Sequence, residues 1–77
     1  LKEEFNMTLV LGAALAVFTG IGAGVGISFA TGKAAESIAR QPEAADKIRG
    51  TFILGAALAE ATAIYGFITA LAIIILK

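Results

Sequence analysis

The chain has 77 residues, of which 58% are hydrophobic, a mean hydropathy of +0.90 and a formal net charge of zero. It is too short and too apolar for an ordinary soluble domain, and it has no basic cluster with which to bind nucleic acid. Because cysteine and histidine are both absent, disulfides, histidine-based metal sites and Ser-His or Cys-His nucleophilic pairs are excluded. Any chemistry must use carboxylates, and we expect neither a metal nor a cofactor.

The first long apolar run extends from Phe5 to Gly32 and contains no charged residue. As a helix, these about 28 residues measure about 42 Å, more than the ~30 Å hydrocarbon core of a bilayer. The run is also longer than the apolar part of a secretory signal. We therefore expect a permanent transmembrane helix over 5–32.

A second apolar run, 51–76, is again long enough to span, and Glu60 is its only charge. Between the two runs, the polar segment 33–50 holds seven of the twelve charged residues and the only proline, Pro42, which marks the turn. The sequence thus predicts an all-α membrane protein, a single hairpin of two transmembrane helices joined by a polar loop.

The distribution of cationic side chains predicts the orientation of this hairpin. Four of them lie in the loop and two near the termini: Lys33, Arg40, Lys47 and Arg49 against Lys2 and Lys77. Because membrane proteins keep the more cationic loops in the cytoplasm, we expect a cytoplasmic loop and both termini outside.

Small residues recur along the first run. At every fourth position stand Gly12, Ala16, Gly20, Gly24, Ser28 and Gly32, with Gly22 and Gly26 beside that row. Each glycine costs up to ~1 kcal/mol relative to alanine in a helix, and close helix approach supplies a compensating gain. A row of small residues over the whole span favours packing of this helix against identical neighbours. A tight hairpin or a homodimer packed through the glycines is the alternative. A phosphate-binding loop is disfavoured, because apolar helix continues on both sides.

Glu60 is the most informative residue, because a charged carboxylate at bilayer depth costs roughly 2.5 to 3.5 kcal/mol. Hydrocarbon favours its neutral form, which makes it a proton carrier. The alternative is a protonated Glu60 that only hydrogen-bonds a neighbouring helix, a bond worth about 0.6 to 2 kcal/mol. Tyr65, five residues on, lies about 140° around the helix, so it reaches only a site shared with another subunit. With no second catalytic group in a span, we expect no enzyme activity of the chain alone.

Three segments together carry a family resemblance: the glycine series 20–26, Ala-Arg-Gln-Pro-Glu-Ala at 39–44 and Leu-Gly-Ala-Ala-Leu-Ala-Glu at 54–60. With them the chain resembles the c-subunit, the rotor-ring proteolipid of F-type ATP synthases, over essentially its whole length. The resemblance implies a cyclic ring of identical hairpins in the plasma membrane of a bacterium, with first helices inside and second helices outside, in contact with lipid. The ring turns against the stator a-subunit as Glu60 takes up and releases an ion. Arg40, Gln41 and Pro42 then contact the central-stalk subunits, and the chain itself is non-catalytic.

The resemblance also bears on the ion. Sodium-carrying members have a glutamine in the first helix and a Ser or Thr directly after the glutamate, where this chain has Ile27 and Ala61. The residues expected around the ion are Ile27, Leu58, Ala61, Thr62 and Tyr65. A bare cation needs several oxygen ligands, whereas a proton needs one carboxyl and one acceptor. We therefore expect protons to be transported, with a sodium ring as the alternative because Thr62 and Tyr65 are retained.

A small two-span pore-former of the holin type is the alternative from a different functional class. In such a protein Glu60 would line a pore or bind a partner helix. The loop favours the rotor subunit, because an Arg-Gln-Pro turn has no evident use in a pore-former.

Overall fold

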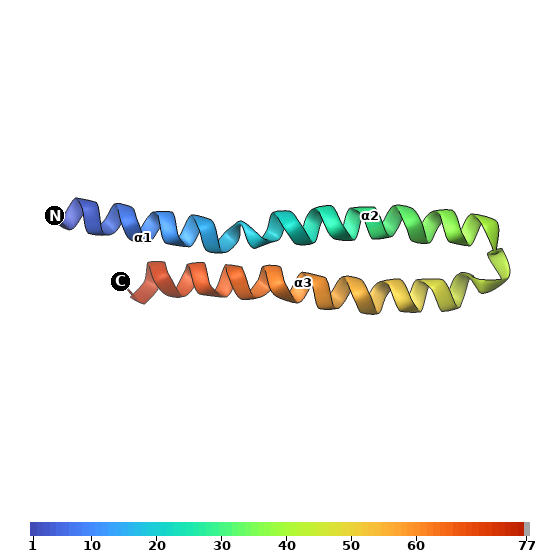
Figure 1. Cartoon of the computed structure of the whole chain (residues 1–77). Coiled ribbons are helices and arrows are strands. Elements are labelled where there is room, and N and C mark those ends of the chain that lie inside the picture. The colour runs from blue at the N-terminus through green and yellow to red at the C-terminus, as the bar shows by residue number, and fades with distance from the viewer. Residues whose placement is uncertain (77) are drawn as a thin grey trace.

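The computed structural model describes residues 1–76, and it consists of two antiparallel helical arms joined by a tight turn (Figure 1). The first arm contains α1 (Lys2–Val17) and α2 (Thr19–Arg40), and the second contains the short 3-10 helix η1 (Pro42–Ala44) and α3 (Ala45–Leu76). The hairpin measures 62 × 16 × 9 Å, with both chain ends at the same end. The predicted all-α hairpin is confirmed. Lys77, which entered the charge comparison, lies outside the described residues.

The polar segment 33–50 differs from the expected loop, because most of it is helical. Only Gln41 lies outside a helix there, and its φ of −133° and ψ of 72° are outside the α region, which a following proline disfavours. An ion pair four residues apart, Arg40 to Glu36 at 2.6 Å, supports the end of α2. Both helices therefore extend beyond the apolar runs, and α2 ends before Pro42, which a helix cannot contain in its interior but can contain in its first turn.

The first arm is interrupted at Phe18, between α1 and α2 (Figure 1). The Phe18 N–H is shared between the carbonyls of Ala14 and Leu15, each at 3.2 Å, and the Ile21 N–H binds the Phe18 carbonyl at 3.0 Å. Two of these bonds, from the Phe18 N–H to Leu15 and from the Ile21 N–H to Phe18, join residues three apart, as in a 3-10 helix. The helix is therefore tighter at this point. The Thr19 hydroxyl also donates to the Ala16 carbonyl at 3.1 Å, a type of bond that bends helices. The continuous helix expected over 5–32 is therefore two helices.

The isolated hairpin has almost no hydrophobic core. Its buried hydrophobic residues are Ala13, Ala23 and Ala70, whereas large apolar side chains such as Phe67, at 56% exposure, lie on the outside. Both arms, Lys2–Arg40 and Pro42–Leu76, are long and apolar enough to cross a membrane. Since so much apolar surface is not covered within the chain, lipid and other chains must cover it.

The two arms meet along a seam of small side chains. On α3 the buried and half-buried positions at the seam recur at three- and four-residue intervals: Phe52, Ala56, Ala59, Ala63, Gly66 and Ala70. Gly66 marks the closest approach, because a Cβ there would overlap the Ala16 carbonyl oxygen and the Thr19 Oγ1. The seam fixes which residues of the two arms share the same depth.

Most of the glycine row takes no part in this seam. A Cβ added at Gly20, Gly22, Gly24 or Gly26 would meet nothing within 4 Å, and Ser28 is exposed. Gly12 differs, since its Cβ would lie 3.9 Å from Ile73 Cδ1, and the half-buried Ala16 lies at the seam. Packing within the hairpin therefore does not explain the central glycines, which leave open space for a neighbouring chain.

We predict that Gly24→Leu prevents assembly of a closed ring while the hairpin still forms, because the new side chain fills space that is open in the hairpin but needed by a neighbour. The mass of the detergent-extracted oligomer measures this. Val25→Leu is the control, because it enlarges an exposed side chain that is already bulky. Rings of normal mass from Gly24→Leu would show that the central glycines do not form the packing face.

Candidate functional site

The candidate site is centred on Glu60, in the middle of the apolar part of α3. Because Thr19 lies against Thr62 and Gly66 against Ala16, the antiparallel arms place Glu60 at the level of the glycine-rich stretch 20–26. Glu60 is exposed, and within residues 1–76 its carboxyl takes part in no hydrogen bond or ion pair. A carboxyl in this position is available to lipid or to an adjacent chain.

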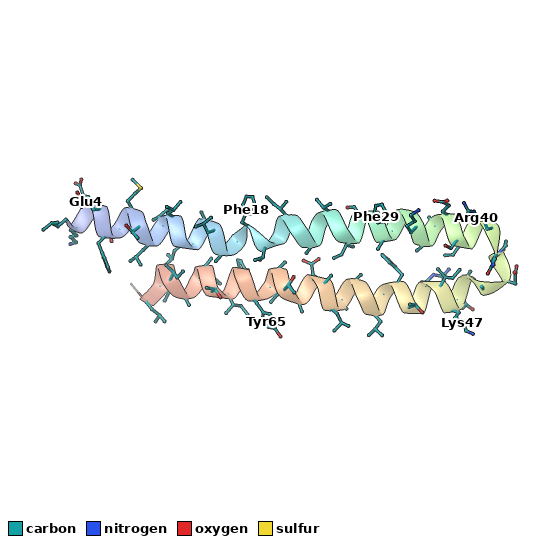
Figure 2. The ribbon with its side chains drawn as sticks, in the orientation of Figure 1. Glu4, Phe18, Phe29, Arg40, Lys47 and Tyr65 are labelled. Atoms are coloured by element: carbon teal, nitrogen blue, oxygen red, sulfur yellow. The ribbon has the colours of Figure 1, made fainter. Side chains whose placement is uncertain are left out.

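The predicted supporting residues do not gather around Glu60 within one hairpin. Leu58 and Tyr65 are exposed, and Tyr65 projects from the side of α3 that faces away from the first arm (Figure 2). On a regular helix Tyr65 lies about 140° and Thr62 about 160° around the axis from Glu60. One chain therefore presents the carboxyl on one flank of α3 and these polar groups on another, so that bringing them together requires a second chain.

Two of the supporting positions contribute no side-chain oxygen. Ile27 is half-buried on α2 and Ala61 is half-buried on α3. The Thr62 hydroxyl donates its proton to the Ala59 carbonyl of its own helix at 2.7 Å, which leaves only its lone pairs for another group. Ile27 and Ala61 therefore add no oxygen ligand, whereas the Thr62 hydroxyl can still accept through its lone pairs.

The predicted stalk contact lies at the opposite end of the hairpin from the termini. Gln41 and Pro42 form the turn and are exposed, and Arg40 ends α2 with its side chain 75% exposed while it pairs with Glu36 (Figure 2). From Glu60 to Pro42 is 18 residues of chain, about 27 Å along helix. These residues therefore cannot touch the carboxyl of their own chain.

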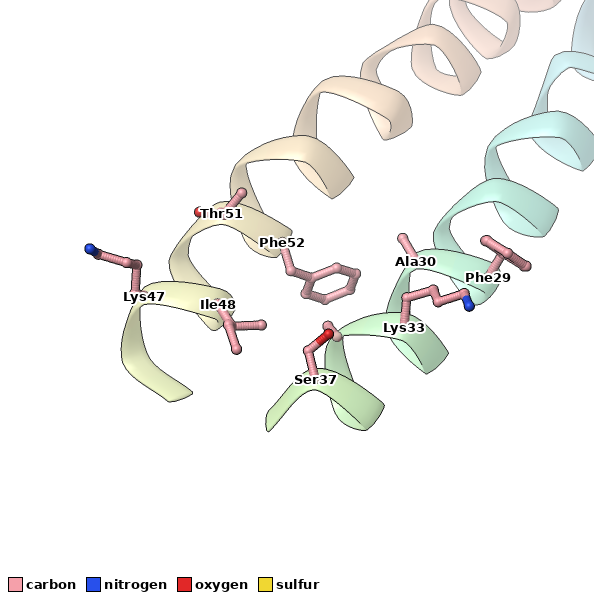
Figure 3. Close-up of a pocket in the computed structure, with 9 residues that line it drawn as sticks. Phe29, Ala30, Lys33, Ser37, Lys47, Ile48, Thr51 and Phe52 are labelled. Carbon is pink, nitrogen blue, oxygen red and sulfur yellow. The ribbon is translucent and has the colours of Figure 1, made fainter. Parts of the chain in front are cut away.

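A groove of about 520 Å³ lies between α2 and α3 near the turn, with the Phe52 ring in the space between the helices (Figure 3). Lys33 and Lys47 edge this groove, but their side chains point away from one another, and the Lys33 Nζ lies 5.6 Å from the centre of the Phe29 ring. They do not converge on a common ligand. Phe52 is about two helical turns from Glu60, so the groove is separate from the carboxyl.

Thr19 is a polar residue near this site that the sequence analysis did not identify. Its hydroxyl lies 3.4 Å from the Thr62 carbonyl, on the far side of the seam. A signal was present in the sequence, because folding the two runs about Pro42 brings these two threonines to the same depth. The glycine row drew attention to small residues instead.

Comparison with known proteins identifies similar chains. The family of the ATP synthase C-subunit matches residues 11–73. The ATP synthase c-subunit of Ruminiclostridium cellulolyticum is 67% identical over 69 residues, which cover 90% of this chain and 91% of that protein. The ATP synthase c-subunit of Caldanaerobacter subterraneus subsp. tengcongensis is 64% identical, over 90% of this chain and 94% of that protein. The ATP synthase c-subunit of Clostridium beijerinckii is 61% identical, over 79% of this chain and 86% of that protein.

The geometry predicts that a hydrophobic carbodiimide, which reacts with protonated carboxyls in lipid, labels Glu60 and none of the other acids. Glu36, Glu43 and Asp46 lie near the turn in the polar segment, outside both apolar runs. Mass spectrometry of the digested chain checks this, with Glu60→Gln as the unlabelled control. Equal labelling of the acids near the turn would contradict the assigned depth of Glu60.

Proposed function

The chain belongs to the ATP synthase C-subunit family, and we propose that it is the proton-carrying subunit of the rotor ring of an F-type ATP synthase. The observation that carries this proposal is the carboxyl of Glu60, which lies in mid-span, is exposed and has no hydrogen bond or ion pair among residues 1–76. A carboxyl that served only to stabilise the hairpin would be paired or hydrogen-bonded within it. A carboxyl that takes up and releases an ion has to be accessible from outside its own hairpin.

In the proposed mechanism Glu60 is neutral while it faces lipid, because a charged carboxylate there costs about 2.5 to 3.5 kcal/mol. It ionises where the stator a-subunit offers water and positive charge, and takes up a proton again on leaving. This difference between the two environments makes the rotation directional. The membrane potential supplies about 2.3 kcal/mol per charge per 100 mV. The chain makes no ATP itself and is a non-catalytic part of the complex.

The neighbouring hairpin completes the ion site in this proposal. The flank of α3 that carries Glu60 in one copy meets the flank that carries Leu58, Thr62 and Tyr65 in the next. The open central glycines allow the first arms to approach closely enough for this. The ring is thus required for ion binding, and it also excludes water from the carboxyl. A family match over 11–73 favours this rotor subunit over a small pore-former.

The orientation proposed from the charge distribution places the turn in the cytoplasm and the termini outside, in the plasma membrane of a bacterium. The bacterial source of the similar proteins supports that membrane. Arg40, Gln41 and Pro42 then face the central stalk. The Arg40 guanidinium pairs with Glu36 at 2.6 Å at the end of α2, next to the turn.

We expect that replacing Arg40 and Gln41 together by alanine lowers the number of protons pumped per ATP hydrolysed severalfold, because the turn no longer grips the stalk. ATP-driven acidification of membrane vesicles, divided by the rate of ATP hydrolysis, measures this ratio. Lys47→Ala is the matched control, since it removes an exposed cation near the turn but outside the Arg-Gln-Pro motif. An unchanged ratio in the double variant would remove the stalk assignment.

Protons are proposed as the ion because Ile27 and Ala61 supply no oxygen ligands. We therefore predict that millimolar sodium near neutral pH barely slows carbodiimide labelling of Glu60, since sodium cannot displace the proton from so poor a ligand set. The Ile27→Gln, Ala61→Ser double variant should become sodium-protected, because it restores both missing oxygens.

The matched control is Ile27→Leu, Ala61→Gly, which changes the same positions without adding oxygen. Strong sodium protection of the unmodified chain would mean that Thr62, Tyr65 and a bound water suffice to coordinate the cation. The sodium-carrying alternative would then replace the proton assignment.

A further inference from the structure

One polar contact crosses the seam between the two arms, at the interruption of the first arm. The Thr19 hydroxyl lies between two carbonyl oxygens, that of Ala16 on its own arm at 3.1 Å and that of Thr62 on α3 at 3.4 Å. A hydroxyl has one proton, so it donates to one of these carbonyls at a time, and the distances favour Ala16. Thr19 therefore lies at the interruption of the first arm, with its hydroxyl oxygen against the backbone of α3.

Gly66 provides the space for this contact. Of the nine glycines, it alone lies where an added Cβ would overlap other atoms, and those atoms are the Ala16 carbonyl oxygen and Thr19 Oγ1. The two oxygens thus occupy a notch in α3 that only the absence of a side chain leaves open. Movement of α3 along the first arm would bring the Ala16 carbonyl against a neighbouring side chain instead.

A notch of this kind matters more in lipid than in water. Lipid tails are as apolar as the alanines of the seam, so packing of small apolar side chains alone defines the sliding position of two helices only weakly. One residue of sliding moves a side chain by 1.5 Å along the axis. Gly66 is six residues, about 9 Å, from Glu60, so whatever fixes Gly66 also fixes the depth of the carboxyl.

We propose that Thr19 and Gly66 form a contact that sets the depth of α3 against the first arm and so positions the Glu60 carboxyl for ion exchange. This inference rests on the proposed role of Glu60 as ion carrier. Thr19 and Gly66 act as positioning residues, since neither has to touch the ion. In a rotor, every copy must present its carboxyl at the same height to one stator, and a fixed register within each hairpin achieves this.

Two pairs of substitutions separate loss of the contact between Thr19 and Gly66 from general effects on side-chain shape and helix propensity. Thr19→Val keeps the shape of the side chain and removes the hydroxyl, whereas Thr19→Ser keeps the hydroxyl. Gly66→Ala places a Cβ in occupied space, whereas Gly50→Ala makes the same change in the same helix where nothing lies within 4 Å. Both glycine changes raise helix propensity equally, so propensity alone cannot separate them.

The test measures carbodiimide labelling of Glu60 against pH in the assembled complex, together with the thermal stability of the ring. No other charged side chain lies in either apolar run, and Tyr65 is the one other titratable group there, so the profile reports the surroundings of Glu60. Thr19→Val and Gly66→Ala should each move the pH of half-maximal labelling by about 0.5 unit or more, about a threefold change in apparent proton affinity. Thr19→Ser and Gly50→Ala should match the unmodified chain.

The double variant Thr19→Val, Gly66→Ala should move the profile no further than the larger single change, because both substitutions disrupt one contact. Unmoved profiles with a merely less heat-stable ring would reduce Thr19 and Gly66 to structural residues and overturn the proposal. If Gly66→Ala fails to assemble, the Thr19→Val and Thr19→Ser pair decides alone. If Glu60 of the unmodified chain is not labelled, the ion-carrier assignment is wrong, and the positioning role of Thr19 and Gly66 is wrong with it.

Discussion

The cost of a charged carboxylate in hydrocarbon is the constraint on which the rest of this molecule depends. Glu60 is the only charged residue in the apolar run 51–76, and a charged carboxylate in hydrocarbon costs about 2.5 to 3.5 kcal/mol. Its own hairpin offers it no partner among the described residues. The open glycines, the exposed Tyr65 and the oxygen-poor positions Ile27 and Ala61 all fit the proposal that a neighbouring chain encloses this carboxyl.

The first arm gives up helix stability at two kinds of position, for different reasons. Its central glycines leave space that the hairpin does not use, and a close neighbour recovers their cost of up to ~1 kcal/mol each. Its interruption at Phe18 lies beside the place where the Ala16 carbonyl and Thr19 meet Gly66 of the same hairpin. Different residues of the same arm thus leave space for a neighbouring chain and contact α3 within the chain.

Sequence reasoning was sufficient for the hairpin, because the lengths of two apolar runs and a lone proline leave few alternatives. It also singled out Glu60 as the candidate ion carrier, since one charge in such a run is conspicuous. It did not foresee that 33–40 and 45–50 are helical, because charge was taken as a sign of loop although these residues are good helix formers. Nor did it foresee the contact of Gly66 with Ala16 and Thr19. Which small residue lies at the closest approach depends on the register of the two arms, and composition does not encode register.

The most direct test of the central claim is ATP-driven acidification of vesicles that contain the reconstituted complex in sodium-free buffer, with the unmodified chain and with Glu60→Gln. Glu60→Gln keeps the size and polarity of the side chain and removes its exchangeable acid, so ring mass should be preserved. The account predicts acidification with the unmodified chain and none with Glu60→Gln rings of normal mass. Equal acidification by both, or acidification that appears only when sodium is added, would contradict it.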